Sequence, residues 1–432
     1  MQTQDNHAIC SDLAIGQTSL PVRIDHVVAK DPSDFPSVDS LLKQFDISVN
    51  GFLPAEPIKK LSSNIPWENI ADVLPTEKNN LTFRKCIESL PDFDLSLLTM
   101  PNDYKRAYVI LTLITNCYVF GSKPITQIIP KKLAEPLWHV SQYLRINPIL
   151  THAAVDLYNW HLADESGPIV LDNLRSTNLM TGTEDEERFY LVMVAIEKIG
   201  SQIIRDLVEI HYVSTDKSID SANLSFGQIL RLLSNIDQCL HEIIAVLKRM
   251  GEKCKPDVFF NVLRPYLKGW ENNDDIPNGM IYEGVADTPM SFCGGSAAQC
   301  SLFQVLDAAF TIVHKSDYFK SIRAYMPGKH QDFIAYVEQT INLKHIISDF
   351  ASDLNYSKLL NVYTNCVESI GLFRSCHMNL VHKYILQQTK VDPTDPTDPT
   401  DPTDPTDAKG TGGTSLVTFL NEAITETYDR AK

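Results

Sequence analysis

Long apolar patterns of helical period limit this chain to a helical fold. Along its 432 residues, apolar side chains recur every three or four positions, which is typical of one face of an α-helix. The pattern predicts four long helices, at residues 188–210, 224–250, 297–314 and 358–387. Few stretches alternate apolar and polar residues as a half-buried strand would. We therefore predict an all-α fold class.

The chain divides into two helical parts and two irregular segments. Residues 1–45 are polar, with acidic residues and prolines crowded at 31–36, and predict a loosely ordered N-terminal segment. Residues 46–145 carry helical patterns broken by prolines and predict a small helical domain, while residues 146–432 predict a large one. Residues 392–407 read DPTDPTDPTDPTDPTD. Proline removes a backbone donor at every third position there, so this insertion predicts a flexible, solvated loop.

Charge and cysteine content exclude several classes of partner. The net charge is −16, from 54 acidic and 38 basic residues, which argues against nucleic acid or an anionic membrane as a partner. The longest apolar stretch, 107–122, is shorter than the ~20 residues of a membrane span. The first residues show no basic segment followed by an apolar core, so we expect no secretory signal. Nine scattered cysteines form no CxxC pair, so neither a zinc ribbon nor a covalently attached haem is indicated. We expect a cytoplasmic protein with free thiols.

His377 stands on the apolar face of the segment GLFRSCHMNLVHKYI, four residues after Phe373. Two interpretations remain open. A histidine in such a place is most often a hydrogen-bonded core residue, but a lone histidine on an apolar helix can also be the axial ligand of a haem iron. His382 lies about 140° further round the helix and cannot share a metal with it. Arg374 could pair with a haem propionate or form an ordinary ion pair.

The segment VFFNVLRPYLKGW, residues 258–270, places aromatic rings beside an arginine. Phe260 and Arg264 are four residues apart on one helical face, and Phe259 is adjacent. Such an arginine can bind a carboxylate in a forked manner while a ring covers a flat ligand. An aromatic core pair beside a solvated arginine fits the spacing as well. Pro265 disfavours a regular helix and predicts a kink at Arg264.

Two glycine-rich stretches predict tight turns. In SFCGGSAAQCSLFQVLD, residues 291–307, Gly294 and Gly295 allow close backbone approach, and Ser296 can cap the next helix. The turn could line a flat cofactor or be a plain helix start. The second stretch, KGTGGT at 409–414, lacks the GxxxxGK[ST] frame of a phosphate loop and follows no predicted strand, so we exclude a nucleotide site.

These segments, in this order, resemble the indoleamine 2,3-dioxygenase family of haem enzymes that cleave tryptophan, in its fungal type. The matching pieces are FFNVLRPYLKGW, FCGGSAAQCSLFQ, FRSCHMNLVHKYI and AKGTGGT, with weaker matches at NGFLP and INPILTHAAVDLYNW. They span about residue 45 to the end of the chain. The resemblance implies a small N-terminal helical domain over a large helical domain that binds haem b.

The resemblance also implies roles for single residues. On the haem side, His377 matches the proximal iron ligand and Arg374 an arginine near the propionates. On the substrate side, Arg264 matches the residue that binds the substrate carboxylate. Phe259 and Phe260 match the aromatic residues that cover the indole. Gly295, Ser296 and Ala297 match the turn that lines the distal pocket. Thr411 matches a residue of a mobile loop near the substrate.

Two positions beside the cofactor depart from the family pattern. The family often has a tyrosine where this chain has His152 and a serine where it has Met193. A methionine thioether cannot donate a hydrogen bond to an indole N–H or to dioxygen. We therefore assign no catalytic acid or base, and we expect substrate affinity or indole selectivity to differ from that of better-known members.

The implied reaction is oxidation of L-tryptophan by O2 to N-formyl-L-kynurenine, the first step of the kynurenine route to NAD. It requires ferrous haem b and a reductant that the sequence does not identify, and the family implies a monomer without a nucleic-acid or membrane partner. One alternative is a haem protein of this fold that binds O2 or senses a ligand without efficient catalysis. Another is a haem-free helical scaffold.

Overall fold

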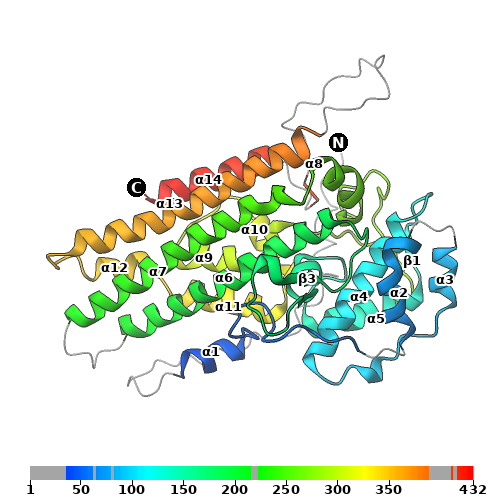
Figure 1. Cartoon of the computed structure of the whole chain (residues 1–432), viewed down its shortest axis with the longest axis horizontal. Coiled ribbons are helices and arrows are strands. Elements are labelled where there is room, and N and C mark those ends of the chain that lie inside the picture. Colours follow the sequence, from blue (N-terminus) through cyan, green and yellow to red (C-terminus); the bar gives the residue numbers. More distant parts are fainter. Residues whose placement is uncertain are drawn as a thin grey trace, which may run out of the picture.

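The predicted all-α class is confirmed by the computed structural model, in which helices dominate and each strand spans two or three residues (Figure 1). The predicted Asp-Pro-Thr loop at 392–407 and residues 1–35 lie outside the described residues. The structure describes residues 36–61, 65–78, 82–215, 222–388, 410–411 and 416–431.

The N-terminal helical part is built around α4 (Pro101–Phe120), whose residues 105–119 are all buried. Helices α2 (Pro66–Glu77) and α5 (Lys131–Leu144) pack against α4. The guanidinium of Arg106 on α4 donates to both carboxylate oxygens of Glu68 on α2, at 2.9 and 2.5 Å. A helix enclosed in this way is mainly apolar on all sides, and a charge buried on it needs a partner.

Shorter elements complete this part of the molecule. They are α3 (Phe83–Ser89), the 3₁₀ turn η2 (Leu95–Leu97) and β1 (Ile128–Ile129). Helix α1 (Val38–Gln44) precedes them in the chain but packs against α6 (Glu184–Thr215) of the large helical part (Figure 1). The hydroxyl of Ser37 accepts the backbone N–H of Ser40 and so caps α1. The last residues of the segment that we predicted as loosely ordered therefore form a helix.

The structure describes two small sheets, one between neighbouring strands and one between strands far apart in the chain. Strand β2 (Trp160–Leu162) pairs antiparallel with β3 (Leu174–Ser176), and β1 pairs parallel with β4 (Ile281–Tyr282). The turns η3 (Ala153–Leu157, a π-helical turn) and η4 (Leu171–Asn173) flank β2. Because β4 follows β1 by about 150 residues, this short pairing ties the large helical part to the small one.

The large helical part consists of four long helices and many short ones. The long helices are α6 (Glu184–Thr215), α7 (Ala222–Lys248), α13 (Tyr356–Val381) and α14 (Leu416–Ala431). The shorter elements are η5 (Arg249–Glu252), α8 (Pro256–Val258), η6 (Phe259–Leu263), η7 (Arg264–Leu267), η8 (Ala297–Gln299), α9 (Ser301–Ala309), α10 (Tyr318–Ser321), η9 (Ile322–Tyr325), α11 (Gly328–Thr340), α12 (Leu343–Ser348) and η10 (His382–Leu386).

Three of the four long helices predicted from apolar periodicity match α6, α7 and α13 to within a few residues. The helix predicted over 297–314 is wrong in extent. A 3₁₀ turn, η8, precedes α9, and α9 ends at Ala309. Thr311 has a positive φ of 52°, a backbone conformation that a continuing α-helix cannot contain.

The long helices form a layer in which α6 packs on α7, α7 on α13 and α13 on α14 (Figure 1). Gly371 lies in the last of these contacts. A Cβ placed on Gly371 would lie 2.6 Å from the ring of Tyr428 on α14, so a larger residue at this position would require the Tyr428 ring to move. None of the helices that the structure describes is both long and apolar enough to cross a membrane.

Asp206 on α6 should weaken the fold at neutral pH. Burial raises its pKa to about 6, although the amide of Gln202 donates to Oδ1 at 2.8 Å. Because the pKa of this carboxyl rises on folding, ionising it destabilises the folded protein. The free energy of unfolding therefore falls as the pH increases from the ordinary pKa of 3.8 through about 6. We expect Asp206→Asn to stabilise the protein by about 1 kcal/mol at pH 8, a value reduced for screening of the charge by solvent. The gain should be smaller at pH 4.5, where the carboxyl of wild type is largely protonated.

Urea denaturation of Asp206→Asn and wild type at the two pH values measures this difference. The same gain at both pH values would assign the effect to packing of the amide and not to the carboxylate charge.

Candidate functional site

One cavity of about 240 Å³ lies in the large helical part. A single water needs only ~10–15 Å³, so this cavity has the size of a ligand site. Its wall is mainly apolar and comes from η3, α6, the η6–η7 segment, the glycine turn before α9, and the helices α13 and α14. The cavity therefore gathers side chains from most of the segments that the sequence analysis selected.

His377 reaches this cavity from α13. Burial lowers the pKa of its imidazole to about 4, so the ring is neutral at physiological pH. Among the described residues, no side chain or backbone group forms a hydrogen bond with either ring nitrogen. A satisfied core histidine would have such a partner. The neutral ring keeps a lone pair available, as a metal-ligating histidine requires.

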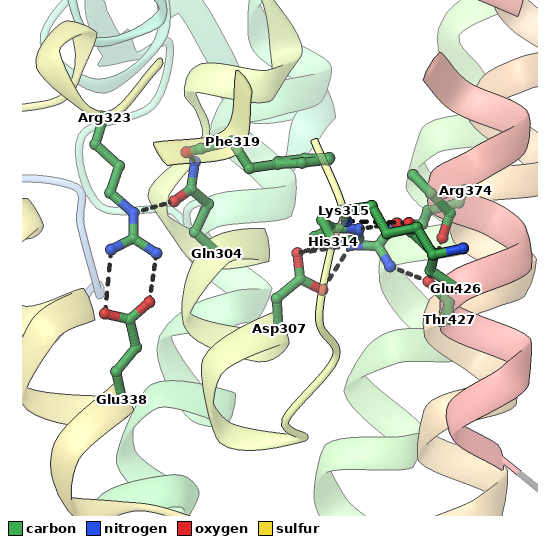
Figure 2. Close-up of polar contacts among 11 residues, drawn as sticks. Gln304, Asp307, His314, Lys315, Phe319, Arg323, Glu338, Arg374, Glu426 and Thr427 are labelled. Carbon is green, nitrogen blue, oxygen red and sulfur yellow. Dashed lines mark hydrogen bonds and ion pairs between the residues drawn. The ribbon is translucent and has the colours of Figure 1, made fainter. Parts of the chain in front are cut away.

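Arg374 lies one helical turn before His377 and also lines the cavity. Its Nη2 donates to both carboxylate oxygens of Asp307 on α9, at 2.6 and 2.7 Å, and its Nη1 donates to Thr427 on α14. Figure 2 shows this contact extending through Asp307 to His314, which lies 3.0 Å from it. Burial alone would raise the pKa of Asp307, but Arg374 and His314 hold it below the ordinary value.

Arg374 therefore has a protein partner, which the sequence analysis did not foresee. A guanidinium carries five N–H groups, so an anion in the cavity could share this arginine with Asp307. The ring nitrogen Nδ1 of His314 is 2.8 Å from Glu426 on α14, and the whole network fixes α9 and α14 against α13.

Of the three site residues predicted in segment 258–270, two line the cavity and one lies outside it. Phe259 and Arg264 line the cavity, whereas Phe260 is not among the lining residues. The Phe260 ring stacks on Arg264 instead, with 5.4 Å from the ring centroid to the guanidinium carbon. The chain changes from a π-helical to a 3₁₀ turn at Arg264, as the predicted kink before Pro265 requires.

Aromatic contacts hold Phe259 in place. Its ring centroid lies 4.8 Å from that of Phe189 on α6 and 5.7 Å from that of Tyr384 on η10. Burial lowers the pKa of Arg264, because a charged guanidinium in an apolar wall lacks hydration. Such an arginine is suited to bind a ligand carboxylate.

The glycine turn and the predicted loop residue Thr411 contact each other at the cavity. Gly295, Ser296, Ala297 and Thr411 all line it. The N–H of Gly294 donates to the carbonyl of Thr411 at 2.9 Å, and the Thr411 hydroxyl donates to the carbonyl of Gly295 at 2.5 Å. Two hydrogen bonds thus join two segments more than 100 residues apart. The Ser296 hydroxyl accepts the N–H of Ala298 at 3.3 Å, which confirms the predicted cap.

His152 and Met193 lie in the cavity wall as well. His152 Nδ1 is 2.6 Å from Asp156 Oδ2, and its Nε2 is 3.4 Å from Glu197 Oε1. Burial opposes protonation of His152, but Asp156 and the hydrogen bonds to Cys300 and Glu197 raise its pKa well above the ordinary value. The contact with Asp156 thus favours protonation of His152, while burial raises the pKa of Asp156 itself.

Sequence reasoning missed Asp156, Glu197 and Cys300. The thiol of Cys300 donates to Glu197 Oε1 at 3.0 Å, and burial raises the pKa of that thiol to about 12. His152, Glu197 and Cys300 offer ligand atoms within 4.8 Å of one another, a spacing that could hold a metal ion. The signal that could have found Asp156 is its place four residues after His152, which is the same face of a helical turn.

Comparison with known proteins places these residues in a family. The model of the indoleamine 2,3-dioxygenase family matches residues 41–430. The chain belongs to this family. The indoleamine 2,3-dioxygenase segments quoted from the sequence lie within this one match, and all of them except NGFLP contribute residues to the cavity wall.

Several relatives of this dioxygenase family are similar over most of the chain. A 6-hydroxytryptophan 2,3-dioxygenase of Fusarium equiseti is 32% identical over 353 residues, covering 80% of this chain and 85% of the relative. Indoleamine 2,3-dioxygenase 1 of Mus musculus is 30% identical over 390 residues, covering 88% and 93%. The indoleamine 2,3-dioxygenase of Saccharomyces cerevisiae is 31% identical over 374 residues, covering 80% of each. The chain is thus a dioxygenase of the tryptophan type.

Proposed function

We propose that this protein is a haem-dependent dioxygenase that opens the indole ring of L-tryptophan with O2 to give N-formyl-L-kynurenine. The observation that carries the proposal is His377, a neutral imidazole without a hydrogen-bond partner among the described residues, at the wall of a ligand-sized cavity. Family membership supports the reaction class.

The residues around the cavity fit haem b. His377 would hold the iron, the apolar walls would enclose the porphyrin, and Arg374 would attract a propionate while keeping Asp307 as its partner. When bound, the haem would supply the binding and activation of O2 for insertion of both oxygen atoms across the C2–C3 bond of the indole. The polypeptide contributes orientation, exclusion of water and charge.

Three groups would hold the substrate. Arg264 would bind the carboxylate, and Phe259 would cover the indole with support from Phe189 and Tyr384. Thr411 and Ser296 lie where the glycine turn and the second glycine-rich segment meet, so they would close the cavity over the amino acid. Phe260 stacks on Arg264 and would position the guanidinium rather than touch the substrate.

The direct test uses purified protein supplied with haemin and a chemical reductant. We expect a Soret band that shifts with carbon monoxide, and conversion of L-tryptophan under ¹⁸O2 to a product containing both labelled atoms. Bound haem without product would favour the O2-binding or ligand-sensing alternative. Protein that takes up no haemin would favour the scaffold.

Arg264→Gln should weaken binding of the substrate. A buried charged hydrogen bond contributes roughly 1.5–3 kcal/mol, so we expect the KM for L-tryptophan to rise about 10- to 100-fold. Tryptamine lacks the carboxylate, so its turnover should respond much less to the same change. Asn261 is exposed on the same segment, and Asn261→Ala is the matched control. An equal loss for both substrates would mean that Arg264 does not contact the carboxylate.

A further inference from the structure

Three side chains of metal-ligating type, from three separate parts of the chain, meet beside the cavity. His152 directly precedes η3, Glu197 lies on α6, and Cys300 lies between η8 and α9. Each offers one ligand atom, and these atoms lie within 4.8 Å of one another. All three residues are buried, with exposed fractions of 4% or less. The proposed dioxygenation makes no use of this group.

The distances within the group are close to those around a tetrahedral ion. Glu197 Oε1 lies 3.4 Å from His152 Nε2 and 3.0 Å from Cys300 Sγ. Zinc binds nitrogen and oxygen at about 2.0–2.2 Å and sulfur at about 2.3 Å, which separates neighbouring ligand atoms by roughly 3.3–3.6 Å. Side-chain shifts of about half an ångström or less would therefore bring both contacts to the required spacing.

His152 is held as a metal ligand requires. Its Nδ1 lies 2.6 Å from Asp156 Oδ2, and a carboxylate on one ring nitrogen is the usual device that orients the other nitrogen toward a metal. The backbone N–H of His152 donates to Oε1 of Gln299 at 2.9 Å, and Gln299 directly precedes Cys300. Contacts from outside the group thus hold His152 beside Cys300.

The carboxylates of this region lack a permanent cation. Within the part of the chain that the structure describes, no lysine or arginine forms an ion pair with Asp156 or Glu197, and both rely on His152. The second carboxylate oxygen of Glu197, Oε2, is buried there without a hydrogen-bond partner. Buried charges are normally paired or coordinate a metal, so a bound cation would supply what the polypeptide does not.

A divalent ion would enter the group without changing its net charge. With His152 protonated, Cys300 as a thiol, and Asp156 and Glu197 ionised, the four side chains carry one net negative charge. An ion with two positive charges that displaces the ring proton and the thiol proton leaves the same net charge. Burial raises the pKa of the Cys300 thiol to about 12, but a coordinated thiol loses its proton to the metal.

We propose that His152, Glu197 and Cys300 bind one zinc ion. An imidazole, a carboxylate and a thiolate are ligands that zinc takes, whereas magnesium and calcium require oxygen ligands. His152 and Cys300 belong to the cavity lining and Glu197 does not, so the ion lies at the wall, and water is its fourth ligand. His377 is not a member of the group. The proposed haem chemistry and the zinc site are thus independent of each other.

The test adds zinc chloride to full-length protein that a chelator has cleared of metal, with and without added haemin. We expect one zinc ion per chain by elemental analysis after gel filtration. X-ray absorption at the zinc edge should show one sulfur at about 2.3 Å together with nitrogen and oxygen at about 2.0–2.2 Å. Calorimetry in buffers of different ionisation enthalpy should show release of about two protons per ion at pH 7.

Substitutions separate the ligands from their surroundings. Cys300→Ser should lower the zinc affinity by more than ~100-fold, and Asp156→Asn, which changes only the partner of a ligand, by about 10- to 100-fold. Cys293→Ser is the matched control, because Cys293 is also buried in the segment before α9 but lies outside the group; it should keep its zinc. If Cys300→Ser does not fold by circular dichroism, Glu197→Gln tests a second ligand.

Each outcome decides for or against the zinc site. Protein that binds no zinc overturns the inference. Zinc that persists in Cys300→Ser, or that is lost equally in Cys293→Ser, is an adventitious ion only and also overturns it. Zinc bound at this site in protein that forms no indole product would support the inference and count against the proposed function. Product formation by protein that binds no zinc would have the opposite meaning.

Discussion

Replacing His377 by alanine should yield a protein that folds but does not retain haem. The imidazole is neutral, has no competing hydrogen bond within the described residues, and lies in the cavity wall. Substituting a residue that only orients a metal ligand lowers metal affinity about 10- to 100-fold. Removing the ligand itself should therefore lower the affinity for haem by more than ~100-fold. The measurement is haem content per chain after gel filtration, with circular dichroism as the test of folding.

His382 provides the matched control for this variant. It lies five residues further along the same continuous helical segment and is exposed, so His382→Ala should keep a full complement of haem. Imidazole added in solution should restore part of the Soret band to His377→Ala, because a small ligand can occupy the space that the side chain leaves. A His377→Ala protein with an unchanged spectrum and full haem would remove the ligand assignment and the proposal built on it.

The sequence predicts the long helices well because their apolar residues recur with the helical period over many turns. Helices α6, α7 and α13 carry apolar faces over many turns, and a pattern that keeps the helical period over such a length is seldom produced by a strand or a loop. The end of α9 is different. The positive φ of Thr311 is set by the packing of the chain beyond it, which no local propensity encodes. Short elements such as η6 and η8 likewise depend on what surrounds them.

For the candidate site, the sequence predicts which segments meet but not what each side chain contacts. Neighbours Phe259 and Phe260 are equally aromatic, yet one lines the cavity and the other stacks on Arg264, because successive residues of a helical turn face different directions. The partner of Arg374 is 67 residues away, in α9. That pairing follows from the packing of α13 beside α9, and periodicity carries no information about it.

Removing the charge of Asp307 should destabilise the protein strongly, even though asparagine has the same shape. Arg374 is 8% exposed and directs two hydrogen bonds to this carboxylate. Taking away one partner of a buried ion pair leaves an uncompensated charge and typically costs 3–5 kcal/mol. We expect Asp307→Asn to lower the free energy of unfolding by about that amount, measured by urea denaturation at pH 7.

The pair Arg323–Glu338 on the neighbouring elements supplies the control (Figure 2). Glu338 is 42% exposed, and exposed ion pairs contribute at most ~1 kcal/mol, so Glu338→Gln should have a small effect. The pH dependence separates charge from packing. Because the folded-state pKa of Asp307 is held below its ordinary value of 3.8, its stabilising effect is complete above that value and is lost as pH falls further. The difference in free energy of unfolding between wild type and Asp307→Asn should therefore become smaller below pH ~4. A difference that stays constant there would mean that the asparagine acts through shape or hydrogen-bond geometry.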